Sequence, residues 1–98
     1  LAGKPAGVFT SSQSSHGGQE STLLSMLLPM LHHGALLVGV PFTEPALHHT
    51  RTGGSPYGAS HVSGAASSPG VLSNHEQVIA RVLGARIADV ARRLGENA

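Results

Sequence analysis

Residues 23–31 hold the feature that most limits how this chain can fold. Seven of these nine residues are Leu or Met, and the other two are Ser25 and Pro29. A helix that is apolar almost all the way round has to be covered on more than one side. We therefore predict a helix over residues 19–33 that packs between other elements. Pro29 is expected to kink or divide this helix, and Gly34 to end it.

Two short apolar segments flank this helix and predict strands over residues 6–10 and 35–40. Neither segment shows the alternation of apolar and polar residues that a half-exposed strand has, so both strands are expected to be covered on two faces. Two such strands joined by a helical crossover are typical of a parallel sheet. The sequence therefore predicts the α/β class with a parallel sheet.

The last helix is predicted over residues 74–94. Ser73 and Glu76 have the spacing of a capping box, in which each residue bonds the backbone of the other. Apolar residues then recur at steps of three and four and mark one face for burial: Ile79, Leu83, Ile87, Val90 and Leu94. Residues 43–72, rich in Gly, Ser, Pro, Thr and His, predict one long loop of a kind that is usually functional, interfacial or disordered.

These elements form too small a unit to cover one another. Two parallel strands and two helices cannot cover both faces of such apolar strands, and small isolated pieces of sheet are marginal in water. A chain of 98 residues is large enough for one domain with a modest core. We therefore expect it to be half of a larger fold.

The composition excludes several classes of protein. The chain has no Cys, so it has no disulfide scaffold, thiolate zinc site or catalytic thiol, and a reducing, cytoplasmic location is expected. A net charge of +1 does not support binding to nucleic acid. No apolar run approaches the ~20 residues of a membrane-spanning helix. Charged residues are only 11% of the chain, which favours association between copies.

The sequence also lacks the common catalytic and cofactor motifs. It has no G-x-G-x-x-G, no phosphate-binding P-loop motif, no H-E-x-x-H and no G-x-S-x-G. Seven His are present, including the pairs His32-His33 and His48-His49. Neighbouring residues on a helix point about 100° apart, so such a pair cannot share one metal ion. No metal site is predicted.

The polar loop of residues 11–18 is the most informative segment for function. It follows a predicted strand and precedes a helix, which is where open α/β sheets bind their ligands. Gly17 and Gly18 allow the backbone to approach a flat ligand, and free amides at the start of a helix can donate to its polar edge. A polar turn that binds nothing is the alternative interpretation.

Three motifs follow one another along the chain: Gly-Gly-Gln-Glu at residues 17–20, His-His-Gly at 32–34 and Gly-Gly-Ser-Pro-Tyr-Gly-Ala at 53–59. As a set, they resemble the C-terminal half of the WrbA-type flavoproteins, which are flavodoxin-like NAD(P)H:quinone oxidoreductases. The resemblance covers nearly the whole chain. It implies a flavodoxin-like three-layer sandwich with a five-stranded parallel sheet, of which this chain supplies about the last two strands and two helices.

The same resemblance implies the site. FMN would be bound by the loop, whose residues are Ser11, Ser12, Gln13, Ser14, Ser15, His16, Gly17 and Gly18. His33 would border the flavin as the catalytic residue, so that loop and imidazole form one wall of the pocket. NAD(P)H would be the co-substrate and a quinone the substrate, with ping-pong hydride transfer through the flavin. The resemblance also implies a homotetramer.

This chain departs from the family pattern in two ways. Its loop is richer in Ser and His than the usual Gly/Thr-rich version and is one residue longer. The phosphate-binding loop and the pocket aromatics of the family are not present, so activity is expected only where an N-terminal half is also present. The alternative function is a non-catalytic flavodoxin-like binding or assembly module, in which residues 43–72 mediate contacts between copies.

Overall fold

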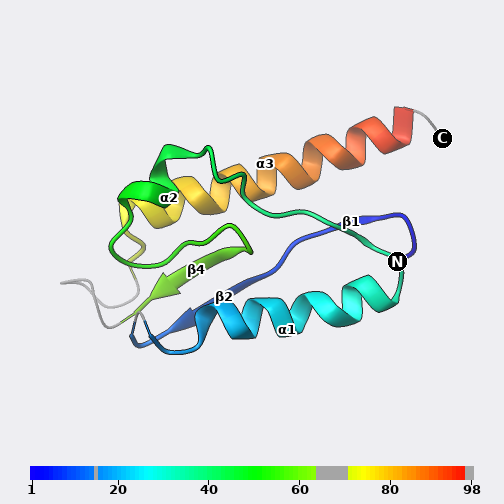
Figure 1. Cartoon of the computed structure of the whole chain (residues 1–98). Coiled ribbons are helices and arrows are strands. Elements are labelled where there is room, and N and C mark those ends of the chain that lie inside the picture. The colour runs from blue at the N-terminus through cyan, green and yellow to red at the C-terminus, as the bar shows by residue number, and fades with distance from the viewer. Residues whose placement is uncertain (15, 64–70, 97–98) are drawn as a thin grey trace.

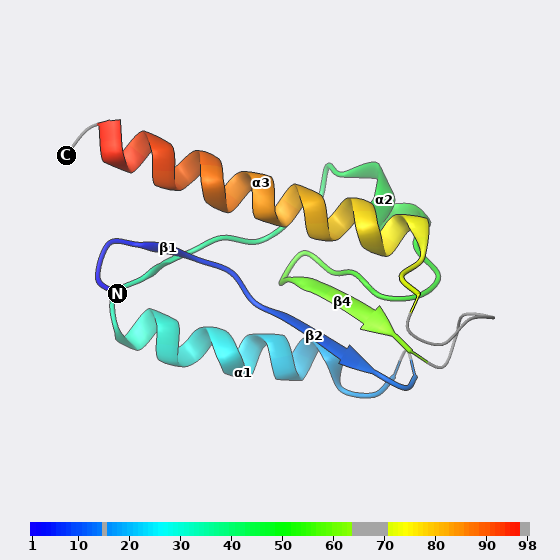
Figure 2. The ribbon, with the colours of Figure 1, turned by 180° about the vertical axis from the view of Figure 1, so that it is seen from behind.

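A computed structural model describes residues 1–14, 16–63 and 71–96. The elements are, in chain order, strands β1 (Pro5–Ala6) and β2 (Phe9–Ser12), helix α1 (Gln19–His32), strand β3 (Leu36–Leu37), helix α2 (Pro45–His49), strand β4 (Ala59–Val62) and helix α3 (Asn74–Glu96). Helix α1 covers one face of the strands and α3 the other (Figure 1). The reverse view shows the same three layers (Figure 2). The predicted α/β class with parallel strands is confirmed, and the arrangement fits part of a flavodoxin-like fold.

All strand pairs are parallel, and β1 and β2 share one extended segment, residues 5–12. Strand β1 pairs with β3, and β2 pairs with β4. The carbonyls that accept from these partners belong to even-numbered residues: Lys4 from the Leu36 N–H (2.8 Å), Ala6 from Val38 (2.8 Å) and Ser12 from Ser63 (2.7 Å). Even-numbered residues of a strand point their backbone groups to the same edge. Both β3 and β4 therefore lie along one edge of residues 5–12.

The strand boundaries differ from those predicted. The strand expected over residues 6–10 extends to Ser12, so two residues assigned to the loop belong to β2. The strand expected over residues 35–40 is regular only in β3, because Val40 donates its N–H to Pro56 (2.9 Å) rather than to residues 5–12. The second half of the edge is occupied by β4.

Residues 43–72 are therefore not one long loop. Their described part contains α2 and β4, and the prediction of a loop over this whole range is wrong. The β4 sequence Ala-Ser-His-Val has no apolar alternation, and it becomes a strand because it pairs with β2 along its length. Helix α2 begins at Pro45, a favoured first helical residue, and Glu44 accepts from the Ala46 N–H at 3.5 Å.

Helix α1 has the predicted extent and ends as expected. Pro29 lies inside it and does not divide it. Gly34 adopts a left-handed φ of 82°. The Gly34 N–H donates to Leu31 and the Ala35 N–H to Met30, both at 3.0 Å. This pair of bonds is a Schellman motif, in which the residue after the cap requires a positive φ and favours glycine.

Most of the apolar surface of α1 is exposed in this chain. Leu23 is the one buried residue of the helix, at 0% exposure. Leu28 and Leu31 are 65% and 59% exposed. The helix is therefore covered on one side by the strands, whereas its composition predicts cover on more than one. Across the described residues, no helix is both long and apolar enough to span a membrane.

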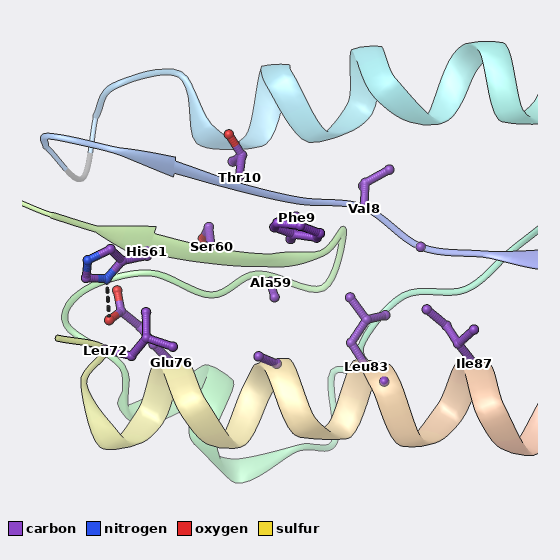
Figure 3. Close-up of a pocket in the computed structure, with 13 residues that line it drawn as sticks. Val8, Phe9, Thr10, Ala59, Ser60, His61, Leu72, Glu76, Leu83 and Ile87 are labelled. Atoms are coloured by element: carbon purple, nitrogen blue, oxygen red, sulfur yellow. Dashed lines mark hydrogen bonds and ion pairs between the residues drawn. The ribbon is translucent and has the colours of Figure 1, made fainter. Parts of the chain in front are cut away.

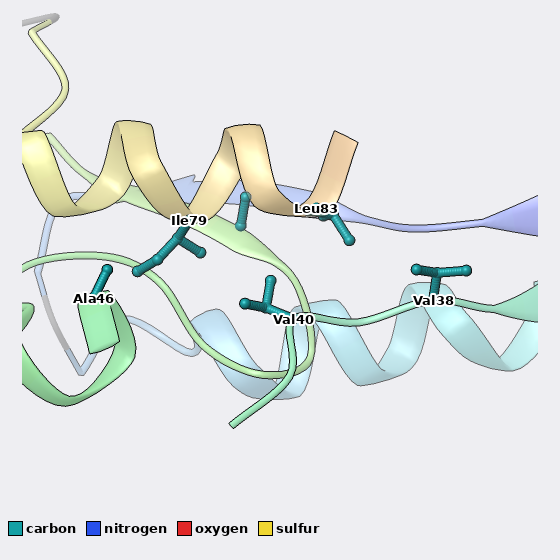
Figure 4. Packing of buried hydrophobic residues seen from close by; sticks show 6 residues of the cluster. Val38, Val40, Ala46, Ile79 and Leu83 are labelled. Carbon is teal, nitrogen blue, oxygen red and sulfur yellow. The ribbon is translucent and has the colours of Figure 1, made fainter. Parts of the chain in front are cut away.

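The buried core lies between α3, α2 and the strand segments (Figure 4). It contains Val38, Val40, Ala46, Ala59, Ile79 and Leu83. The predicted apolar face of α3 supplies its centre, because Ile79 is fully buried and Leu83 is 5% exposed. Ile87 and Val90 pack at its margin. The face loses contact towards the end of the helix, where Leu94 is 39% exposed.

Ile79→Ala is expected to lower the free energy of unfolding by about 2–5 kcal/mol, because truncation leaves a cavity in the middle of the core. The matched control is Val78→Ala, one position away on the same helix and 38% exposed, with an expected loss of less than about 1 kcal/mol. Urea denaturation followed by circular dichroism measures both. Equal losses for the two variants would contradict this description of the core.

Candidate functional site

A polar cleft of about 420 Å³ lies at the N-terminal end of α1. Two segments that are far apart in the sequence form it: the end of the 11–18 loop with the first turn of α1, and the turn that follows α2. The residues that line it are His16, Gly18, Gln19, Glu20, Ser21, Thr52, Gly54 and Ser55. The fold therefore brings the Gly-Gly-Gln-Glu motif beside the Gly-Gly-Ser-Pro-Tyr-Gly-Ala motif.

The start of α1 offers backbone donors to this cleft. Gly18 caps the helix with a left-handed φ of 80° and supplies no side-chain hydrogen bond. The first bond of the helix runs from the Thr22 N–H to the Gly18 carbonyl (2.9 Å). The amides before Thr22 have no intrahelical partner, because a helix leaves its first donors unpaired. They lie at the positive end of the helix dipole and suit an anionic or polar ligand edge.

Gln19 fixes the position of the loop. Its Nε2 donates to Ser12 Oγ (2.8 Å) and to the His61 carbonyl (3.1 Å), which joins the ends of β2 and β4 to the start of α1. The Ser12 hydroxyl donates in turn to the Ser14 carbonyl (2.7 Å). Gln19 is not among the predicted site residues, although its place in the Gly-Gly-Gln-Glu motif was the available signal.

Most of the predicted loop residues are exposed, and two of them, His16 and Gly18, line this cleft. Ser11 and Ser12 lie at the end of β2, and Gln13, Ser14, His16, Gly17 and Gly18 form the bend into α1. Ser15 lies outside the described residues. A Cβ on Gly17 would lie 3.0 Å from the Ser12 Cβ and 3.2 Å from the Ser14 carbonyl oxygen, so the bend is tight at this position.

His33 lies at the other end of α1. It is the C-cap residue, it is exposed, and its ring meets that of His32 edge-on with centroids 5.2 Å apart. At about 1.5 Å per residue, the 14 residues of α1 span about 20 Å. Figure 1 shows the two ends of α1 at opposite ends of the strand layer. Within one chain, the structure therefore does not bring Gly17 and His33 to one pocket wall.

A buried carboxylate holds the turn on the far side of the cleft. Glu76 is 2% exposed, and its Oε1 accepts from the Ser73 N–H (2.8 Å) and His61 Nδ1 (2.9 Å). Its Oε2 accepts from the N–H groups of Gly53 (2.7 Å) and Val62 (2.9 Å). The predicted capping box is confirmed, since Glu76 also donates its N–H to Ser73 Oγ (3.2 Å). Figure 3 shows the bond between His61 and Glu76.

These bonds keep Glu76 ionised. Burial alone would raise its pKa, but the hydrogen bonds from Ser73, His61, Val62 and Gly53 outweigh burial and lower the pKa to about 2. A charged Glu76 therefore ties the start of α3 to β4 and to the Gly53 turn that borders the cleft. The sequence predicted only the local bonds, because Gly53 lies 23 residues away.

No metal centre is built from the described part of the chain, where no three His, Asp or Glu side chains are grouped closely enough to hold an ion. The rings of His49 and His75 form an isolated pair with centroids 6.2 Å apart. Two imidazoles without a third ligand do not make a typical metal site.

Curated relatives identify what the chain is similar to, although no protein-family model matches it. It is 47% identical to a protein of Solidesulfovibrio magneticus over 97 residues, which is 96% of this chain and 47% of the relative. It is 46% identical to a protein of Syntrophobacter fumaroxidans, covering 99% of this chain and 48% of the relative. Both relatives are named NAD(P)H dehydrogenase (quinone). The chain is homologous to part of these NAD(P)H dehydrogenases (quinone).

The homology confirms the resemblance inferred from the three motifs. A relative of the same name in Archaeoglobus fulgidus is 46% identical over 96% of this chain and 44% of its own length. The chain therefore spans about half the length of the NAD(P)H dehydrogenases (quinone) that it matches. The polar cleft and the Glu76 network lie within the matched part.

The pKa of Glu76 predicts how stability depends on pH. A carboxylate whose pKa falls from 4.5 in the unfolded chain to about 2 stabilises the fold above pH 4.5 and loses that contribution as the pH falls towards 2. The loss is expected to be about 3 kcal/mol. The free energy of unfolding is measured with denaturant at a series of pH values from about 6 to about 2.5, roughly the window in which Glu76 titrates.

Glu76→Gln is the matched control for this measurement, because it keeps the shape of the side chain and removes the charge. The variant is expected to be less stable at pH 6 and to lose most of the decline towards acid. A variant that declines as steeply as the original chain would show that other groups cause the acid sensitivity.

Proposed function

We propose that this chain is the flavin-edge half of an FMN-dependent NAD(P)H:quinone reductase. The relatives' names supply NAD(P)H and quinone, and the motif resemblance supplies FMN. The observation that carries the proposal is the cleft at the start of α1, where two of the three motifs meet beside unpaired backbone amides. The absence of Cys supports the expected cytoplasmic location.

The residues of the cleft fit the polar edge of a flat ring. Gly17 and Gly18 carry no side chain that would hold a ring away from the backbone. Amides in the first turn of α1 would stabilise the negative charge that develops on a flavin ring upon reduction, each by about 1.5–3 kcal/mol. When bound, FMN supplies the hydride transfer between NAD(P)H and quinone. The chain's part is to orient the ring and stabilise that charge.

His33 lies too far from the cleft of its own chain to contribute to it. It lies about 20 Å from the loop of its own chain, so we propose that it serves the ring of a neighbouring copy in a homotetramer. The exposed side chains of Leu28 and Leu31 lie on the same half of α1 and give it an apolar surface for such an assembly. The His33 imidazole would orient the quinone and donate to its carbonyl as charge develops.

The test uses one polypeptide in which this chain follows the unmatched half of the Solidesulfovibrio magneticus relative. We expect a yellow tetramer whose flavin absorbance is bleached by NADH and restored by benzoquinone. The resemblance places the FMN phosphate in the other half, so both halves are needed. A colourless tetramer that takes up no FMN would contradict the proposal and support the binding or assembly module.

His33→Ala in that protein is expected to lower quinone turnover about tenfold, the effect of losing one interaction of about 1.4 kcal/mol in the transition state. FMN occupancy should not change, because the loop and not the imidazole holds the ring edge. His32→Ala is the matched control, since His32 is the adjacent exposed imidazole, and it should keep its turnover. Equal turnover in the two variants would remove the role proposed for His33.

A further inference from the structure

The bend of residues 13–18 leads into α1, and all of its described residues are exposed. Buried apolar contacts therefore do not hold it, and such segments open easily unless hydrogen bonds fix them. The bonds inside the bend are local: the Ser14 carbonyl accepts from the Gly17 N–H (3.1 Å) and from Ser12 Oγ (2.7 Å). Bonds that tie the bend to other elements have to come from its ends.

The Gln19 side chain supplies these bonds. Gln19 is the first residue of α1 and is half-buried. Its Nε2 donates to Ser12 Oγ (2.8 Å) at the end of β2, which joins the two ends of the bend. The same Nε2 donates to the His61 carbonyl (3.1 Å) in β4. The bend is thereby closed at its base and tied to both strands of the β2–β4 pair.

Strand β4 also holds the opposite wall of the cleft. Gly54, which lines the cleft, donates its N–H to Ser60 Oγ (2.7 Å), and Ser60 is a buried residue of β4. Glu76 fixes the same strand by accepting from His61 Nδ1 (2.9 Å; Figure 3). Gln19 therefore sets the start of α1 against the strand that fixes the other wall.

The two acceptors around Nε2 require a donor at this position. The His61 carbonyl can accept a hydrogen bond and cannot donate one. The Ser12 hydroxyl donates its one hydrogen to the Ser14 carbonyl, so towards Gln19 it can only accept. Both hydrogens of the Gln19 amide are thus used within the protein, and Gln19 acts through the bend and not by donating to a ligand.

We propose that Gln19 is the positioning residue of the cleft: it holds the glycine bend and the first amides of α1 where they meet the edge of the flavin ring. This inference rests on the proposed function. The amides stabilise a reduced, negatively charged ring more than an oxidised one. A displaced start of α1 therefore weakens binding of FMN and weakens binding of reduced FMN most, so the reduction potential of the bound flavin falls.

The test uses the fused protein, in which this chain follows the unmatched half of the Solidesulfovibrio magneticus relative. Gln19→Met keeps the length of the side chain and removes both donors. We expect the dissociation constant of FMN to rise about tenfold, the effect of losing two hydrogen bonds. Reduced FMN should lose a further factor of about ten, which lowers the two-electron potential by about 30 mV. Quenching of flavin fluorescence measures the dissociation constant, and equilibration with a reference dye measures the potential.

Gln77→Met is the matched control. Gln77 is also a half-buried Gln near the start of a helix, and its Nε2 donates to a backbone carbonyl, that of Leu72 (3.2 Å). It does not line the cleft. The dissociation constant should stay within about twofold of the original, and the potential should not change. If Gln19→Met does not fold, Gln19→Glu repeats the comparison against Gln77→Glu, because a carboxylate keeps the shape of the amide and donates no hydrogen bond.

A role in folding alone predicts a different result, in which the folded and fully loaded Gln19 variant keeps the original potential. That result, an unchanged dissociation constant, or equal changes in the Gln19 and Gln77 variants would overturn this inference and leave the proposed function standing. A fused protein that takes up no FMN before any substitution contradicts the proposed function, and this inference with it. The two failures are therefore distinguishable.

Discussion

Residues 5–12 pair through one edge with both β3 and β4, and the arrangement of the chain follows from that pairing. Residues 38–58, which connect β3 to β4, leave this edge after β3, and the chain returns to it at β4. On its way it places the Gly53–Ser55 turn beside the start of α1. Glu76 then fixes this turn through the Gly53 N–H and fixes β4 through the Val62 N–H. One strand edge and one buried carboxylate thus position both sides of the cleft.

The same geometry explains why this chain contains only part of a binding site. The cleft supplies backbone donors and a tight glycine bend, which suit the edge of a ring. His33 lies at the far end of α1, and the outward surface of that helix is apolar and uncovered. The second edge of residues 5–12 also pairs with no strand in the part of the chain that the structure describes. The proposed function accounts for each of these features, because it joins this chain to the other half of the domain and to further copies of the same protein.

Local patterns in the sequence predicted the parts of the fold that local interactions determine. The extents of α1 and α3, the Gly34 stop and the Ser73–Glu76 capping box follow from periodicity and capping chemistry. Strand β4 was not predicted, because it forms by pairing with β2 and its own sequence has no apolar alternation. The long-range contacts of Glu76 leave no trace in spacing. The separation of His33 from the loop was predictable, since a 14-residue helix has a known length.

Residues 5–12 pair with β3 and β4 along one edge, and along the other edge they pair with no described strand. Amide hydrogen exchange followed by nuclear magnetic resonance tests this pairing most directly. In the chain alone, the amides of Thr10 and Ser12 should exchange slowly and those of Phe9 and Ser11 quickly, and the latter should become protected when the other half is added. Equal protection of both sets in the chain alone would contradict the account.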